Sequence, residues 1–201
     1  MEAKSTLSAA GVPSRELEGE LRNLMVRYQA GDRPAMEALV GELSPQLMRF
    51  LSGPQVSRAD AEDLLQECWM RIHRSRHTYR GSEPLLPWIY AIARHTRLDG
   101  YRRRQRRGAR EVLVSEVPER AHQPSGKAQP PDLMRLLEQL PESQREVVTL
   151  LKVSGMSLED VARATASSVG AVKQKAHRAY ARLRELLAQG EPQGEANANR
   201  L

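Results

Sequence analysis

Hydrophobic residues recur at steps of three and four through most of the chain, which is the spacing of one face of an α-helix. This pattern predicts helices over residues 15–29, 33–43, 45–51, 59–76 and 88–107. Gly31 and Pro45 separate the first three, and residues 77–87, with a glycine and two prolines, predict a loop. The only strand candidate is the short stretch 112–114. The first half of the chain is therefore expected to be helical.

A second helical module is predicted over residues 132–188, as four short helices ending in a helix-turn-helix. In the last helix one apolar stripe is formed by Val169, Val172, Ala176, Ala179, Leu183, Leu186 and Leu187. Basic residues lie elsewhere around this helix, and the Ser168 hydroxyl is positioned to cap its first turn. A basic helix in such a motif is typical of proteins that read the DNA major groove.

The two helical modules are separated by residues 115–131, which hold four prolines and almost no periodicity. We therefore predict an all-α fold of two small helical domains joined by a flexible linker. The expected boundaries are a disordered N-terminus (1–14), a first domain (15–110), a linker (111–131), a second domain (132–188) and a disordered tail (189–201).

The charge of the chain points to nucleic acid. Its net charge is +6, and residues 102–110 hold six arginines in nine positions. Cations also complement the C-terminal end of a helix dipole, so a solvated helix end is the alternative interpretation. Six guanidinium groups in about two turns repel one another, however, and phosphates would relieve that repulsion.

Composition excludes several other classes of protein. Cys68 is the only cysteine, which rules out an internal disulfide. There is no apolar run long enough to span a membrane and no signal-peptide pattern near the start, so a cytoplasmic protein is expected. Cys68, His73 and His77 do not share one helix face, and no catalytic or phosphate-binding motif is present. We expect no metal, no cofactor and no enzymatic activity.

Three segments together resemble the extracytoplasmic-function (ECF, group IV) sigma factors of the sigma-70 family. They are DAEDLLQECW (60–69), PWIYAIARHTRLDGYRRR (87–104) and the helix-turn-helix segment 140–185. The resemblance covers most of residues 15–188 and keeps the order and spacing of the family's motifs. It implies that the first domain corresponds to region 2, which binds the coiled-coil clamp of RNA polymerase and opens the minus-10 promoter element. The second domain would correspond to region 4, which reads the minus-35 element.

The resemblance assigns polymerase binding to one face of the predicted 59–76 helix. Four residues at steps of three and four share this face: Asp63, Gln66, Glu67 and Met70. Acidic residues in a first turn also favour the helix dipole, which is an alternative explanation for Asp60, Glu62 and Asp63 but not for Gln66 and Glu67.

Minus-10 DNA is assigned to the loop after that helix and to the next helix. The set implied by the resemblance is His77, Thr78, Tyr79, Arg80, Arg94, His95, Arg97, Asp99, Arg102 and Arg103. The arginines would hold phosphates, and the loop would supply hydrogen-bonding and stacking groups for an extruded base. Trp88 is expected in the core because it opens the apolar stripe, and Tyr90, which lies off the stripe, is expected at the surface.

Minus-35 DNA is assigned to the polar face of the last helix. Base-edge contacts are expected from Ser168, Ala171, Gln174, Lys175 and Arg178, and phosphate contacts from Lys173 and Arg182. Ala171, Ala176 and the Ala166–Ser167 turn depart from the family's usual residues, which predicts a loosely packed helix pair and an uncommon promoter sequence.

The predicted function is thus a promoter-specificity subunit whose partners are RNA polymerase core, promoter DNA and a cognate anti-sigma factor. Two alternatives remain at this stage. One is an autonomous regulator that uses only its helix-turn-helix. The other is a helical adaptor that mimics a sigma factor to capture its inhibitor, against which the arginine cluster argues.

Overall fold

The computed structural model describes residues 15–53, 56–111 and 133–190, and the regular structure within these ranges is entirely helical. The expected strand at 112–114, the linker core and both chain ends lie outside the described residues. Two helical modules are present, and we call them the N-terminal module (α1–α4) and the C-terminal module (α5–α8).

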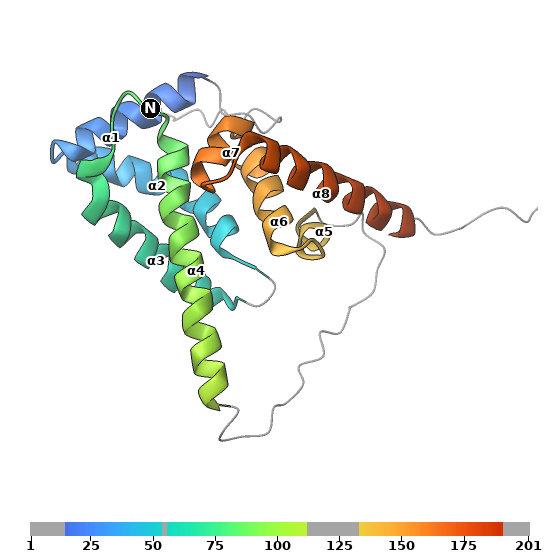
Figure 1. Ribbon diagram of the computed structural model, residues 1–201. Helices are drawn as coiled ribbons and strands as arrows, with labels where there is room; N and C mark the ends of the chain where they lie inside the picture. Colours follow the sequence, from blue (N-terminus) through green and yellow to red (C-terminus); the bar gives the residue numbers. More distant parts are fainter. Residues whose placement is uncertain (1–14, 54–55, 112–132, 191–201) are drawn as a thin grey trace, which may run out of the picture.

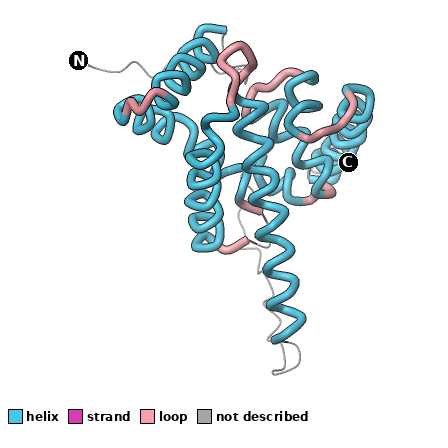
Figure 2. The backbone as a smooth tube through the Cα atoms, turned by 60° about the vertical axis from the view of Figure 1, so that its left-hand side comes forward, coloured by secondary structure: helices cyan, strands magenta, loops and turns pink. Residues whose placement is uncertain are grey.

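Four long helices form the N-terminal module. They are α1 (Arg15–Gln29), α2 (Arg33–Leu51), α3 (Arg58–Ser75) and α4 (Leu85–Glu111), with a short 3₁₀ turn, η1 (Arg76–Thr78), after α3. Helix α4 lies between α1–α3 on one side and the C-terminal module on the other, and its C-terminal end extends well beyond the rest of the molecule (Figures 1 and 2). This end carries the arginine-rich segment.

The predicted break at Pro45 is wrong, because α2 continues through it as one helix. A proline inside a helix removes one backbone hydrogen bond and costs roughly 3 kcal/mol. The apolar stripe continues on both sides of Pro45, and Leu39, Leu43, Leu47 and Phe50 are all buried. Each fully buried side chain of this size contributes about 1.5–3 kcal/mol, which offsets the loss.

Helix α4 begins at Leu85, three residues before the predicted start, and α1 helps to fix this position. The Leu85 backbone N–H donates to Glu18 Oε1 at 2.6 Å, so a side chain 67 positions earlier satisfies a free N–H of the first turn. Pro84 directly before the helix has no side-chain acceptor to do so. This long-range cap explains why sequence pattern alone misplaces the helix start.

Burial along α4 differs from the prediction at two tyrosines. Tyr90 is 1% exposed, although it was expected at the surface, whereas Tyr101, which the apolar periodicity of this helix also places in the core, is 42% exposed. Trp88 is partly buried against the core, as expected. The reason is that α4 is covered on two sides: Tyr90 packs edge-on against Phe50 and also faces the C-terminal module.

The C-terminal module contains the four expected helical pieces. They are α5 (Leu133–Glu138), α6 (Glu142–Val148) with the π-helical turn η2 (Thr149–Val153), α7 (Leu158–Ala164) and α8 (Val169–Gly190). A capping box between Ser157 and Asp160 starts α7, and the Ser168 hydroxyl accepts from the Ala171 N–H at 3.1 Å to start α8, as predicted. Val172, Ala176 and Ala179 of the predicted stripe are buried, but Leu187 at its end is exposed.

The two modules pack directly against each other, which the sequence did not indicate. One cluster of buried side chains runs from α1–α4 into α6, η2, α7 and α8. Figure 1 shows α7 beside the upper part of α4, and the contacts between these two helices are among the most extensive in the molecule. The N-terminal half of α4 is therefore enclosed on both sides, while its C-terminal half is open.

Candidate polymerase and nucleic-acid interfaces

The residues predicted to bind polymerase form one accessible surface on α3. Asp63, Gln66 and Met70 are exposed, and Glu67 is half-buried at the edge of the surface nearest α4. Met70 is one of few large apolar side chains that remain exposed among the described residues. The opposite face of α3 is buried through Ala61, Leu64, Cys68 and Ile72. An acidic surface with an exposed apolar centre suits a protein partner.

An ion-pair network joins this surface to α4. Arg71 donates to Glu67 Oε1 at 2.5 Å and to Asp99 Oδ2 at 2.8 Å, and Arg103 pairs with the other oxygen of Glu67. Burial alone would raise the pKa of Glu67, but the hydrogen bonds from Arg103 and Arg71 outweigh it, so its pKa lies below its ordinary value. The hydrogen bond from Arg71 lowers the pKa of Asp99 in the same way. Both carboxylates are thus held ionised and oriented.

This network connects two predicted sites. Glu67 belongs to the predicted polymerase surface, whereas Asp99 and Arg103 belong to the predicted minus-10 set. A small cavity of about 160 Å³ lies at the junction and is lined by residues of both helices, among them Asp63, Glu67, Gly100 and Arg103. Gly100 permits the close approach of the helices, since a Cβ there would lie 2.6 Å from Leu64 Cδ2.

The predicted minus-10 loop is only partly available to a ligand. His77, Thr78 and Arg80 are exposed. Tyr79, which was predicted to face DNA, is instead buried: its ring lies 5.6 Å from that of Trp88, and its hydroxyl donates to the Glu83 carbonyl at 2.7 Å. The ring anchors the loop to the core, because burial of a large aromatic side chain lowers the free energy of the folded state.

The α4 members of the predicted minus-10 set divide into two groups. His95, Arg102 and Arg103 are exposed, and Asp99 is partly exposed. Arg94 and Arg97 do not share this surface. Their side chains point towards α6, where both meet the carboxylate of Glu146 in the C-terminal module.

The contact between the modules is polar at its centre. Arg97 Nη2 lies 2.9 Å from Glu146 Oε1, and Arg94 Nε lies 3.2 Å from the same oxygen. Arg97 also stacks over the Phe50 ring at 4.5 Å. Deeper in the contact, the Ser154 hydroxyl and the Tyr90 hydroxyl form a buried hydrogen bond of 2.6 Å. The π-helical turn η2 ends just before Ser154, which is its C-cap residue.

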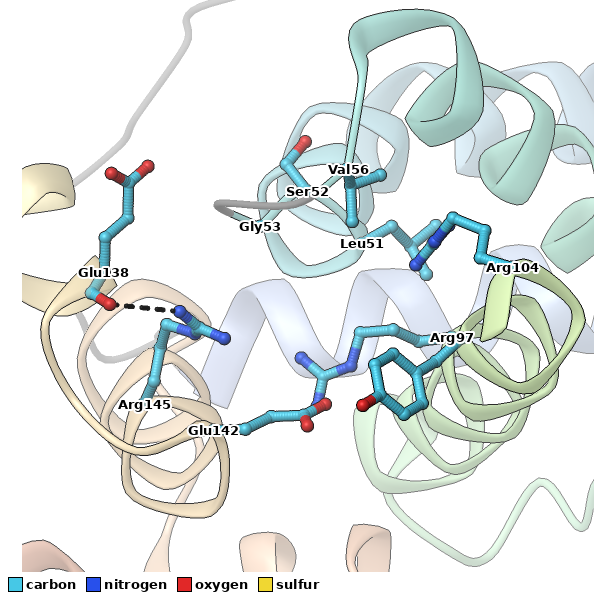
Figure 3. A pocket seen from close by; sticks show the side chains of 10 residues that line it. Leu51, Ser52, Gly53, Val56, Arg97, Arg104, Glu138, Glu142 and Arg145 are labelled. Carbon is cyan, nitrogen blue, oxygen red and sulfur yellow. Dashed lines mark hydrogen bonds and ion pairs between the residues drawn. The ribbon is translucent and has the colours of Figure 1, made fainter. Parts of the chain in front are cut away.

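A cavity of about 390 Å³ opens beside this contact, between the end of α2, α4 and the start of α6. Figure 3 shows Arg97 and Glu142 at its floor, with Arg104 and Arg145 on opposite sides. Arg145 donates to the Glu138 carbonyl, and Glu142 lies 3.7 Å from Arg97. Solvent therefore reaches one side of Arg97 although the rest of its side chain is enclosed.

The predicted minus-35 residues are all accessible on the helix-turn-helix, and all but Lys173 share one side of α8 and its cap. Ser168, Lys173, Gln174, Arg178 and Arg182 are exposed, and Ala171 and Lys175 are half-buried. The turn before α8 contains Ala166 at φ +49°, a left-handed conformation in which glycine is the ordinary residue. The unusual Ala166–Ser167 pair noted in the sequence thus folds into the usual turn at some cost in backbone strain.

Glu146 is the residue that sequence reasoning missed. It is 6% exposed, in a chain where charged side chains are otherwise mostly accessible across the described ranges. The sequence does indicate that Glu146 is buried, because it precedes Leu150 by one helical turn and so lies on the apolar face of α6. A carboxylate on such a face needs a cationic partner. Sequence could not say that the partners were Arg94 and Arg97, because this requires the packing of the two modules.

Comparison with known proteins agrees with this architecture. The model of Sigma-70 region 2 matches residues 39–107, and that of Sigma-70 region 4 matches residues 132–183, together more than half of the chain. The chain is 34% identical over 166 residues to the RNA polymerase sigma factor CarQ of Myxococcus xanthus, covering 81% of this chain and 95% of that protein. It is 33% identical over 180 residues to the ECF RNA polymerase sigma factor SigF of Caulobacter vibrioides, covering 85% and 95%.

The chain belongs to the ECF sigma factors of the sigma-70 family. It is therefore a non-enzymatic initiation factor, which directs RNA polymerase to promoters. The modules are the sigma factor's region 2 and region 4, and we use these names below.

Solved structures share the fold of this ECF sigma factor. One is the sigma factor RpoE in complex with the anti-sigma factor NepR from Bartonella quintana, at 26% identity and a TM-score of 0.62, covering 76% of this chain and 96% of that chain. Another is CnrH in complex with the cytosolic domain of CnrY, at 24% identity and a TM-score of 0.62, covering 86% and 99%. No helix within the described residues is long and apolar enough to cross a membrane.

Proposed function

We propose that this sigma factor binds RNA polymerase and the minus-10 element through two surfaces of region 2, and the minus-35 element through one surface of region 4. The observation that carries this proposal is the helix-turn-helix face: six of the seven predicted DNA-contacting residues of α8 and its cap, all but Lys173, lie at least half-accessible on one side, while Val172, Ala176 and Ala179 on another side of α8 are buried. This face reads the minus-35 element, with Gln174, Lys175 and Arg178 reaching base edges and Lys173 and Arg182 holding phosphates.

Region 2 binds polymerase core through Asp63, Gln66, Glu67 and Met70. Support comes from their shared accessible face and from Arg71, which fixes Glu67 in place. The exposed His77, Thr78 and Arg80 of the loop, with His95, Asp99, Arg102 and Arg103 on α4, act on the minus-10 element. The buried Tyr79 holds this loop from behind and does not stack on a base.

We further propose an anti-sigma factor as the regulatory partner of this protein and the cytoplasm as its place of action, beside polymerase. The solved RpoE complex with NepR supports the first point, since its sigma factor shares both identity and fold with this chain. Such an inhibitor would act by covering the α3 face or the α8 face.

Transcription in vitro with core polymerase on a genomic DNA library tests the proposal. New start sites are expected only when the sigma factor is added. Gln174→Ala should reduce use of these sites by at least about tenfold, the loss expected from one base contact. Arg184→Ala, at an exposed position of the same helix outside the predicted set, is the matched control and should leave them unchanged.

The minus-10 assignment needs a separate variant. Arg102 is 72% exposed and lies 3.8 Å from Asp99, whereas Arg103 is bonded directly to Glu67, so Arg102→Glu perturbs DNA contact and leaves both arginine partners of Glu67 in place. Promoter opening, followed by permanganate reactivity of unpaired thymines, should fall while affinity for core polymerase is retained. Arg33→Glu, at a position 86% exposed at the start of α2, is the control for charge alone. Unchanged opening in Arg102→Glu would remove this arginine from the assignment.

A further inference from the structure

Two arginines of the predicted minus-10 set form ion pairs with a carboxylate of region 4 and are therefore not available to DNA in this structure. Arg94 and Arg97 are 28% and 12% exposed, and both approach the same oxygen of Glu146, whose side chain is 7% exposed. A single carboxylate oxygen between two guanidinium groups matches the arrangement of a phosphate oxygen held by two arginines.

The hydrogen-bonding capacity of this cluster is not filled. The Nε atoms of Arg94 and Arg97 are buried and have no hydrogen-bond partner. Arg94 Nε lies close to Glu146 but without hydrogen-bond geometry. Two guanidinium groups offer ten N–H donors, more than one carboxylate can accept. A phosphate group, with more acceptor oxygens, satisfies such a pair better.

We propose that Glu146 occupies the place of a DNA phosphate between Arg94 and Arg97. It thereby holds region 2 and region 4 together in a closed state, in which the two arginines cannot bind promoter DNA. The inference rests on the proposed function, since it takes both arginines as minus-10 phosphate contacts. Opening of the module contact releases them, and DNA then takes the place of Glu146.

The surroundings of the cluster fit a contact that opens. The cavity beside Arg97 admits solvent, and a phosphate entering there meets Arg97, Arg104 and Arg145 (Figure 3). At the outer edge of the contact only one described ion pair, between Glu83 and Arg163 at 3.3 Å, links the loop before α4 to α7, and both side chains are more than half exposed. An exposed pair of this kind contributes little. The ion pairs of Arg94 and Arg97 with Glu146 are therefore the main charged interaction between region 2 and region 4.

Removal of the Glu146 charge tests the proposal. Glu146→Gln leaves Arg94 without its carboxylate partner and Arg97 with only the more distant, half-exposed Glu142. The population of the closed state should therefore fall at least about a hundredfold relative to the open state. Glu142→Gln is the matched control. Glu142 also faces Arg97, but at 3.7 Å and with half of its side chain exposed, and only a small shift is expected.

Two readouts follow the change in the full-length protein. Dyes on Glu37→Cys in region 2 and Arg182→Cys in region 4, both exposed positions, report separation of the modules by energy transfer in a Cys68→Ser background. Binding of labelled oligo(dT) reports the freed arginines. The slope of log K against log salt should steepen by about 1.4 in Glu146→Gln, because each added phosphate contact on single-stranded DNA contributes about 0.7.

The proposal is overturned if Glu146→Gln, with an unchanged helical circular dichroism spectrum, retains the wild-type dye separation and salt slope. If Glu146→Gln fails to fold, Ser154→Ala provides the second variant, since it leaves the Tyr90 hydroxyl buried at the same module contact without its partner. It should raise the open fraction by roughly fivefold or more. An unchanged dye separation in Ser154→Ala also counts against a closed state.

Failure of the proposed function has a different signature. If wild-type protein yields no new start sites with core polymerase, the assignment of the DNA surfaces is wrong whatever Glu146 does. If start sites appear but Arg94→Gln and Arg97→Gln leave promoter opening intact, the two arginines do not act on DNA, and the closed state has no bearing on initiation.

Discussion

At the scale of single residues, Cys68 shows how burial decides chemistry. Its side chain is fully enclosed between α3 and the rest of the core, and burial raises the pKa of the thiol to about 12. Only the thiolate is reactive, so at neutral pH the folded protein presents almost no nucleophile here. Cys68 is therefore a packing residue on the buried face of α3.

We predict that Cys68 reacts with a disulfide reagent at least about a hundredfold more slowly in the folded protein than in denaturant. The measurement is the rate of colour release by Ellman's reagent at neutral pH. Glu37→Cys, at an exposed position on α2, is the internal control and should react at the rate of a free thiol in the native state. A Cys68 rate close to that of the control would contradict the burial.

Ala166 is the residue at which backbone strain is predicted. Its φ of +49° costs an alanine roughly 1 kcal/mol relative to glycine, part of which glycine loses again through the greater freedom of its unfolded chain. Ala166→Gly should thus raise the free energy of unfolding by roughly 0.5 kcal/mol, as measured by urea denaturation. Ala181→Gly, in the interior of α8, should lower it by about 1 kcal/mol. Equal losses in both variants would mean that the turn is not left-handed.

At the scale of elements, the α3–α4 pair carries a prediction about pH. The pKa values of Glu67 and Asp99 are lowered from 4.5 and 3.8 in the folded state, which therefore binds their protons less tightly than the unfolded chain does. Their contribution to stability is present above about pH 4.5 and is lost as the pH falls through the lowered values. Arg71 is the shared partner of both carboxylates.

Arg71→Met should accordingly flatten the fall in stability on acidification below about pH 4.5, because Asp99 loses the main cause of its lowered pKa and Glu67 keeps only Arg103. Denaturation midpoints between pH 6 and pH 3 provide the measurement. Affinity for core polymerase should also fall severalfold, because Arg71 no longer holds the Glu67 side chain in place. Arg58→Met removes a fully exposed pair with Glu62 on the same helix and should change neither quantity. A wild-type pH profile in Arg71→Met would exclude the network.

The elements also show what sequence can and cannot predict. Periodicity located every long helix, because each one buries a single apolar stripe. It failed where the decisive partner is distant in the chain: the start of α4 depends on Glu18, and the continuity of α2 through Pro45 depends on the core around Leu43 and Leu47. Tyr79 and Tyr90 were misplaced for the same reason, as each is buried by a second layer of structure that no local pattern reveals.

At the scale of the whole molecule, the accessibility of the proposed polymerase and minus-35 surfaces could be predicted from the sequence, because each lies on a single helix and its cap. The division of the minus-10 set could not. Arg94 and Arg97 lie within about two turns of His95, Asp99 and Arg102, which are exposed or partly exposed, and the packing of region 4 on α4 separates the two groups. The same helix therefore presents one accessible basic surface and one covered basic surface.

The buried hydrogen bond between Tyr90 and Ser154 gives a measure of how strongly the two regions are coupled. Ser154→Ala leaves the Tyr90 hydroxyl buried without a partner and should cost about 1–3 kcal/mol, whereas Tyr90→Phe leaves only the smaller serine hydroxyl unpaired. The double variant should be less destabilised than the sum of the single variants, with a coupling of about 1 kcal/mol. The measurement is a double-mutant cycle on the free energy of unfolding of the full-length protein.

The reference cycle uses Tyr28→Phe and His73→Ala. The Tyr28 hydroxyl and His73 Nδ1 form a 2.6 Å hydrogen bond that lies entirely within region 2. If the regions are packed in solution, both cycles give coupling, and Ser154→Ala also raises the open fraction in the energy-transfer assay. If they are independent, the Tyr28–His73 cycle alone gives coupling, and the unfolding curve separates into two transitions. The comparison thus tells whether the enclosed face of α4 belongs to the free protein, which is the condition for Glu146 to compete with DNA.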